Sequence, residues 1–240
     1  MNPFAVNARW RRSLAAVRSA VASCRKTIAR IGDAPDQNTI GHVFETIYRT
    51  HAWPGSESVS GPGSGLVRTA LIRDDLTRLV RGLDVKVILD AGCGDFNWMN
   101  ETDLAACRYI GVDVVPELIA RNRTLYAAAG REFEICDVTR DPLPAVDLIV
   151  CRDCLVHLPF REALQALENF KASGSTYLLT TTFTARTTNA DIVIGQWRPL
   201  NLERAPFDLP EPLGLIDERC QVDDGRYSDK RLALWPLARL

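Results

Sequence analysis

The stretch VILDAGCGDFNWM, residues 87–99, decides how this chain folds. Its first residues are apolar without alternation, which indicates a strand buried on both faces of a parallel sheet. Asp90 ends the strand, and a turn with two glycines, Gly92 and Gly94, leads into a helix. A strand, a glycine turn and a helix start are typical of nucleotide-binding α/β units. In such units the glycines let a ligand approach the backbone, and the helix N-terminus offers free N–H groups.

The glycine turn lacks the residues that usually bind phosphate. The dinucleotide pattern G-x-G-x-x-G is absent, because Asn97 stands where the third glycine would be. The G-K-[ST] of phosphate-binding loops is absent as well. The turn therefore predicts a nucleoside-like ligand without a pyrophosphate.

Length and composition limit the class of protein. The chain has 240 residues, enough for one α/β domain with a substantial core and an N-terminal extension. A formal net charge of −1 gives no basic field, so we expect no nucleic-acid partner. No apolar run has membrane-spanning length, and no signal peptide is visible. The seven cysteines are irregularly spaced, which is typical of reduced thiols, so we expect a cytoplasmic protein.

The composition divides the chain into three regions. Residues 1–35 form a basic helical extension and linker, with seven basic side chains and no acid before Asp33. An amphipathic helix of this kind can bind an anionic membrane surface or partner, but its apolar face is mostly alanine. We therefore expect a solvated helix that packs on its own domain, with at most weak membrane contact. Residues 36–84 form a helical and loop lid region, and residues 85–240 form the main domain.

From residue 85 onward, strand and helix patterns alternate. Strands are predicted at 85–90, 108–113, 131–136, 146–151 and 175–182, and helices at 116–129 and 159–172. This alternation predicts an α/β fold, with a parallel sheet, right-handed crossovers and helices on both faces. Residues 213–236 hold two strand patterns around the turn signal DDGRYSD, which predicts a terminal antiparallel hairpin.

Several motifs in this order resemble class I S-adenosylmethionine-dependent methyltransferases. They are LDAGCGD, YIGVDVVPELIARN and FEICDVTRDPLPAVDLIVCRDCLVHL, and the resemblance covers about residues 85–236. The motifs SGPGS, GDFNWM, CRDCLVHL and WRPLNL also resemble those of a bacterial subgroup of these enzymes. The resemblance implies a Rossmann-like, seven-stranded, mostly parallel sheet with an antiparallel terminal hairpin. It also implies S-adenosyl-L-methionine as cofactor and methyl transfer as activity.

The resemblance, combined with the predicted strand ends, assigns a cofactor site. Gly92, Cys93 and Gly94 are expected against the methionine portion of the cofactor, with Asp90 toward its ammonium group. Asp113 ends the second strand and is expected on the ribose diol.

Four more residues belong to this predicted site. Asp137 follows the third strand and is expected on the adenine amine, with the N–H of Val138 toward a ring nitrogen. Trp98 is expected to pack near the methionine portion. Arg152, at the end of the fourth strand, is expected beside the transferable methyl group.

Residues 151–157, CRDCLVH, supply the candidate catalytic groups. Asp153 and His157 are four positions apart, so on a helix they would share a face. The carboxylate would then orient an imidazole that takes a proton from an acceptor hydroxyl; the alternative is a structural histidine. Cys151 and Cys154 form C-x-x-C, but without a second pair they predict packing thiols rather than zinc ligands. The chemistry requires no metal, although Asp153 would suit magnesium.

Two segments are expected to bind the methyl acceptor. Tyr48 and Trp53 adjoin WPGSESVSGPGSG, residues 53–65, which we interpret as a lid, with a flexible surface loop as the alternative. The insertion after the fifth strand supplies an aromatic ring, a guanidinium and an amide, those of Trp197, Arg198 and Asn201. The alternative role of this insertion is to brace the edge of the core. These groups favour oxygen on a small molecule or glycan as the acceptor. N-methylation of a small metabolite and a non-catalytic cofactor-binding scaffold are the alternatives, and the sequence leaves the oligomeric state open.

Overall fold

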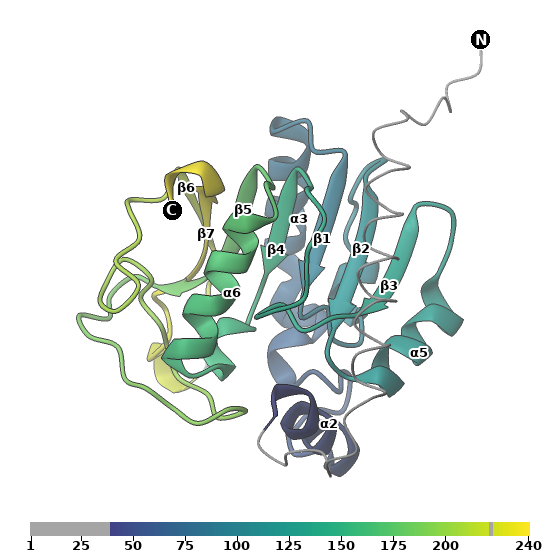
Figure 1. Cartoon of the computed structure of the whole chain (residues 1–240), viewed down its shortest axis with the longest axis horizontal. Helices are drawn as coiled ribbons and strands as arrows, with labels where there is room; N and C mark the ends of the chain where they lie inside the picture. The colour runs from purple at the N-terminus through teal and green to yellow at the C-terminus, as the bar shows by residue number, and fades with distance from the viewer. Residues whose placement is uncertain (1–38, 221–222) are drawn as a thin grey trace.

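The computed structural model describes residues 39–220 and 223–240 (Figure 1). The basic helix and linker predicted in residues 1–35 lie outside the described residues. Within the described ranges, no helix is both long enough and apolar enough to cross a bilayer.

A seven-stranded sheet forms the centre of the fold, in the order β3-β2-β1-β4-β5-β7-β6. Its strands are β1 Val87–Ala91, β2 Arg108–Asp113, β3 Arg131–Ile135, β4 Leu148–Cys151, β5 Tyr177–Phe183, β6 Gly214–Asp217 and β7 Lys230–Pro236. The strands β3, β2, β1, β4 and β5 are parallel, whereas β7 is antiparallel to both of its neighbours, β5 and β6. The predicted Rossmann-like sheet with a terminal antiparallel hairpin is confirmed.

Five α-helices surround this sheet in the described residues. They are α2 Ile40–Thr50, α3 Leu66–Gly82, α4 Asn97–Asn100, α5 Pro116–Tyr126 and α6 Phe160–Ala172. Short 3₁₀ helices are η1 Pro62–Ser64, η2 Leu155–His157, η3 Asp223–Gly225 and η4 Leu237–Arg239. Pro116 begins α5, as predicted for a residue whose missing N–H costs nothing at the first helical position.

Helices cover both faces of the sheet, as predicted. Successive side chains of β1 point to opposite faces: Leu89 packs in the cluster that contains Phe170 of α6, and Ile88 in the cluster that contains Leu76 of α3. Figure 1 shows α6 in front of the sheet and α3 behind it. Every residue of β1 is buried, which explains its apolar run without alternation.

The helix α2 lies beyond one end of the sheet (Figure 1). Thr39 caps its first turn, because the Thr39 Oγ1 accepts a hydrogen bond from the N–H of His42 at 3.3 Å. Arg49, in its last turn, donates from Nε to Glu117 of α5 at 3.0 Å. These contacts hold α2 near the end at which β1 and β2 finish.

Candidate functional site

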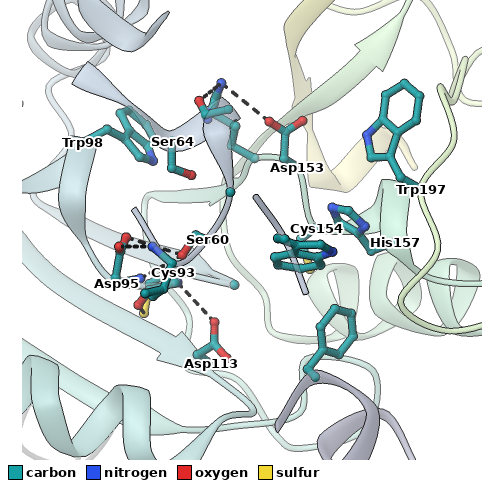
Figure 2. Close-up of a pocket in the computed structure, with 18 of the residues that line it drawn as sticks. Ser60, Ser64, Cys93, Asp95, Trp98, Asp113, Asp153, Cys154, His157 and Trp197 are labelled. Atoms are coloured by element: carbon teal, nitrogen blue, oxygen red, sulfur yellow. Dashed lines mark hydrogen bonds and ion pairs between the residues drawn. The ribbon is translucent and has the colours of Figure 1, made fainter. Parts of the chain in front are cut away.

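A cavity of about 970 Å³ opens at the carboxyl ends of the parallel strands. Its walls come from the glycine turn at 92–94, the ends of β2 and β4, the helix α2 and the loop 53–65. This edge is the usual ligand site of an open α/β sheet. Figure 2 shows two groups of side chains. Cys93, Asp95 and Asp113 form the side that we call the glycine side, and Asp153, His157 and Trp197 form the histidine side.

The glycine turn is held by backbone hydrogen bonds and depends on its small residues. The N–H groups of Gly92 and Cys93 both donate to the carbonyl of Val112 at 2.9 Å. Gly92 has φ of +80° and Gly94 has φ of +55°, a region that favours glycine. A Cβ atom on Gly94 would lie 2.1 Å from the Oγ of Ser60. The turn therefore leaves bare backbone where the loop 53–65 approaches.

Asp113 ends β2 and holds the glycine turn while it lines the cavity. Its Oδ2 accepts from the N–H of Gly94 at 3.1 Å, and its Oδ1 accepts from the N–H of Val115 at 3.0 Å. Burial raises the pKa of this carboxyl, and the backbone donors at Val115 and Gly94 act in the opposite direction. The Asp113 carboxylate is thus fixed at the strand end where the sequence predicted a ligand for a diol.

Asp90 lines the same side of the cavity from the end of β1. The residue is 3% exposed, and the hydroxyl of Tyr109 donates to its Oδ2 at 2.6 Å. Burial raises the pKa of Asp90 to about 7, while the hydrogen bond from Tyr109 lowers it. A cationic group bound beside this carboxyl would favour its charged form, which is compatible with the predicted ammonium contact.

Asp137 and Val138 line the cavity, but Asp137 already has partners within the protein. Its Oδ1 accepts from the N–H and the hydroxyl of Thr139 at 3.0 and 2.6 Å, and its Oδ2 lies 3.0 Å from the Nε of Arg140. The adenine contact of Asp137 and Val138 therefore stays a prediction. The remaining residues of the predicted cofactor site also line the cavity: Gly92, Cys93, Gly94, Trp98 and Arg152.

Asp95 ties the loop 53–65 to the glycine turn, a contact that the sequence did not reveal. Its carboxylate accepts from the hydroxyl of Ser58 at 3.0 Å and from the N–H of Val59 at 2.9 Å. The N–H of Asp95 donates to the Oγ of Ser60 at 3.0 Å. The motifs SGPGS and GDFNWM contain Ser60 and Asp95, and only the fold brings them together. The loop therefore lies closed on the turn.

Replacing Asp95 with Ala should loosen the loop 53–65. The variant lacks the carboxylate that accepts hydrogen bonds from Ser58, Val59 and Ser60, and a hydrogen bond to a charged group contributes about 1.5–3 kcal/mol. Limited digestion with a protease that cuts after Glu57 should then be at least about tenfold faster, since 1.4 kcal/mol corresponds to a factor of ten. Asp103→Ala is the matched control, because the exposed Asp103 carboxylate binds Arg81 and the N–H of Ala105 and does not contact the loop 53–65. Equal cleavage of both variants would show that Asp95 does not hold the loop.

Four charged side chains form a network on the histidine side. Arg152 donates to both carboxylate oxygens of Glu218, at 2.7 and 3.2 Å, and to the carbonyl of Gly63 at 3.0 Å. Lys230 lies 2.6 Å from Asp153 and 3.1 Å from Glu218. Glu218 follows β6 and Lys230 begins β7. Neither residue was predicted from the sequence, because nothing near Glu218 or Lys230 marks it as part of the site.

Asp153 has a different partner from the predicted one. The four-residue spacing from His157 assumed a helix, which is wrong: Asp153 has φ of +53°, and the short 3₁₀ helix η2 follows it. Burial alone would raise the pKa of Asp153, but Lys230 and Arg152 outweigh burial and lower it. Asp153 is therefore an ionised partner of Lys230. Among residues 39–220 and 223–240, no group of three His, Cys, Asp or Glu is placed to hold a metal ion.

The His157 ring lines the cavity with one nitrogen engaged. Its Nδ1 lies 3.0 Å from the carbonyl of Gln196, so Nδ1 carries the proton and donates. The ring packs against Trp53, with centroids 4.6 Å apart. Burial lowers the pKa of His157, while Asp153 acts in the opposite direction. The imidazole is therefore neutral near pH 7, and its Nε2 is able to accept a proton.

The predicted acceptor residues divide into two pairs. Tyr48 and Trp197 line the cavity, whereas Arg198 and Asn201 are buried outside its lining. Arg198 donates at 2.6–3.1 Å to three backbone carbonyls, those of Leu155, Leu158 and Ala190. Asn201 donates to the carbonyl of Arg186 at 2.8 Å. The prediction that Arg198 and Asn201 bind the acceptor is wrong: they brace the insertion, which was the alternative role.

Comparisons with known proteins give one family match. Residues 88–173 match a family model described as a methyltransferase domain. No curated protein matches the chain. Among solved structures, the chain is similar to a TehB-like S-adenosylmethionine-dependent methyltransferase from Corynebacterium glutamicum ATCC 13032. The identity is 20%, the alignment covers 67% of this chain and 85% of that chain, and the TM-score is 0.47.

Two further solved structures contain S-adenosylhomocysteine. The N-methyltransferase NodS from Bradyrhizobium japonicum WM9 is 21% identical, with 48% of this chain and 62% of that chain covered and a TM-score of 0.41. The magnesium protoporphyrin IX methyltransferase from Synechocystis PCC 6803 is 15% identical, with 60% and 72% covered and a TM-score of 0.42.

The residues at the cavity fit S-adenosyl-L-methionine. The glycine turn and the carboxyls of Asp90 and Asp113, which the sequence predicted as contacts of this cofactor, line one cavity. The fold, this donor set and the family match agree. The chain therefore carries an S-adenosylmethionine-dependent methyltransferase domain over residues 88–173.

Proposed function

We propose that this methyltransferase acts on an oxygen atom of a small molecule or glycan. The observation that carries the proposal is the neutral His157 ring on the cavity wall, with Nδ1 held by Gln196 and Nε2 left to accept a proton. A hydroxyl is a poor nucleophile while it keeps its proton, so a base within reach accelerates its reaction.

The remaining residues of the cavity would bind and orient the two reactants. When bound, S-adenosyl-L-methionine supplies a methyl group that is already activated on a sulfonium. The glycine turn would hold its methionine portion, Asp113 its ribose and Asp137 its adenine. Alignment and exclusion of water then contribute most of the acceleration. The loop 53–65, which Asp95 holds on the turn, would help to exclude water once the cofactor is bound.

In the proposed transfer, His157 accepts the proton of the acceptor hydroxyl. The acceptor oxygen forms the new bond to carbon, its proton passes to Nε2 of His157, and the electron pair of the broken carbon–sulfur bond stays on sulfur. The loop 53–65, which forms one wall of the cavity, and a net charge of −1 support a small acceptor rather than a nucleic acid. Methylation of an amine nitrogen is the second candidate, and it would depend less on His157.

Asp113→Ala should weaken binding of S-adenosylmethionine and S-adenosylhomocysteine by about tenfold to a hundredfold, measured by calorimetric titration. The loss corresponds to about 1.5–3 kcal/mol for a hydrogen bond to a charged group. The matched control is Asp147→Ala. Asp147 also accepts two backbone N–H groups, those of Lys86 and Val87 at 2.9 Å, but it is not part of the cavity lining. Undiminished affinity in a folded Asp113 variant would reject the cofactor assignment. An acceptor screen with the wild-type enzyme then tests the oxygen acceptor directly.

A further inference from the structure

Aromatic rings dominate the histidine side of the cavity. Phe44 and Trp53 come from α2 and the loop that follows it, and their ring centroids are 5.9 Å apart. Trp197 lies in the insertion after β5, and Tyr227 lies just before β7. Both also line the cavity, and their ring centroids are 4.9 Å apart. Large apolar surfaces with a few polar groups are typical of small-molecule sites. This part of the cavity is therefore built to contact the apolar surface of a ligand.

Trp197 is a large side chain that the protein leaves partly uncovered. The residue is 41% exposed, yet its ring is held edge-to-face by Phe183 at 82° and by Tyr227 at 79°. The indole is therefore rigid as well as accessible. A rigid aromatic ring on a cavity wall contacts a ligand at low entropic cost and suits a flat or ring-shaped partner.

The charges next to these rings cancel. Arg152 and Lys230 are positive, Asp153 and Glu218 are negative, and each has an oppositely charged partner within 3.5 Å. A carboxylate or an ammonium group on the acceptor would have to displace one of these pairs. The other arginines of the lining, Arg68 and Arg219, are exposed to solvent, where a charge contributes little.

Neutral hydroxyl groups fit this network without disturbing it. The Asp153 side chain is 23% exposed and that of Lys230 is 10% exposed, and both line the cavity. A hydroxyl both donates and accepts, so one hydroxyl can donate to Asp153 while a neighbour accepts from Lys230. Figure 2 shows Asp153, His157 and Trp197 together on this side, so a ring on Trp197 would have its hydroxyls near both the ion pair and the base.

We infer that the acceptor is a neutral, polyhydroxylated ring of the kind found in uncharged sugars. Its C–H face packs on Trp197, its hydroxyls bond to Asp153 and Lys230, and one hydroxyl gives its proton to His157. This inference rests on the proposed oxygen methylation and narrows the class of acceptor.

The test uses the full chain, saturated with S-adenosylhomocysteine, and calorimetric titration of four probes. They are a neutral methyl glycoside series, glucuronic acid, glucosamine and a neutral phenol. We expect a neutral glycoside to bind at least about tenfold more tightly than either charged sugar, which would be a difference of about 1.4 kcal/mol or more. Trp197→Leu should weaken that binding by a similar factor. Leu213→Ala should not, because Leu213 is 52% exposed and lies outside the cavity lining.

A methyl-transfer assay with the same probes separates the possible failures. Methylation of the phenol in preference to every glycoside, with dependence on His157, would overturn the sugar assignment and leave oxygen methylation standing. Preferred methylation of an amine would overturn both. Tighter binding of glucuronic acid or glucosamine, or glycoside binding that is unaffected in a folded Trp197→Leu variant, would also contradict the inference.

Discussion

Glu218→Ala should lower the free energy of unfolding by about 3–5 kcal/mol, the usual cost of removing one partner from a buried ion pair. Glu218 accepts two hydrogen bonds from Arg152, and both side chains are 4% exposed. The variant leaves the Arg152 guanidinium with a single carboxylate, that of Asp153, at 3.5 Å. Lys230 loses one of its two partners as well. Urea denaturation monitored by circular dichroism measures the change.

Two further variants show whether charge causes the loss. Glu218→Gln keeps the shape of the side chain and removes its charge, so it should lose most of the same stability. Glu117→Ala removes a carboxylate from a pair with Arg49 in which both side chains are well exposed, and it should change stability little. A small loss in Glu218→Ala, similar to that of Glu117→Ala, would mean that solvent already compensates these charges.

His157→Gln should reduce kcat by about a hundredfold or more with an oxygen acceptor, the usual contribution of a general base. Glutamine can still donate to the carbonyl of Gln196 but cannot take up the proton. The matched control is His51→Asn. His51 ends α2 with φ of +49°, which asparagine tolerates, and it lies outside the cavity lining.

The pH profile of kcat provides a second measurement on His157. Burial lowers the pKa of His157, so the ring is already neutral below the ordinary imidazole value of about 6.5. The wild-type rate should therefore rise with pH along an acid limb centred below that value and then level off. The Gln variant should lack this limb. Near-normal turnover without His157 would make the histidine structural and favour nitrogen methylation.

The glycine side of the cavity could be predicted because its signals are local. Asp90, Gly92 and Gly94 lie within five residues of one another, and Asp113 ends the very next strand. In a parallel sheet the ends of neighbouring strands meet at one edge, so the pattern of strands was enough to place these groups. The strand β4 and the helix α6 could also be predicted, because the apolar run of β4 and the helical pattern of α6 are local signals.

Asp153, His157 and Trp197 of the histidine side were predicted, but the ion-pair network around Asp153 was not, because it depends on contacts between distant residues. Asp153 and Lys230 are 77 positions apart, and no periodicity links them. The positive φ of Asp153 cannot be read from its neighbours, and it invalidated the helical spacing to His157. Arg198 was misjudged because a guanidinium that binds backbone carbonyls looks the same in a sequence as one that binds a ligand.

The position of β7 between β5 and β6 makes the histidine side depend on one strand. The strand β6 precedes β7 in the chain, yet within the described sheet it pairs only with β7. Glu218 follows β6 directly and Lys230 begins β7, so the positions of both charges depend on the pairing of β7 with β5. The glycine side lies at the ends of β1 and β2, which do not pair with β7. A change that weakens the pairing of β5 with β7 should therefore disturb the wall around Asp153 and leave the glycine turn in place.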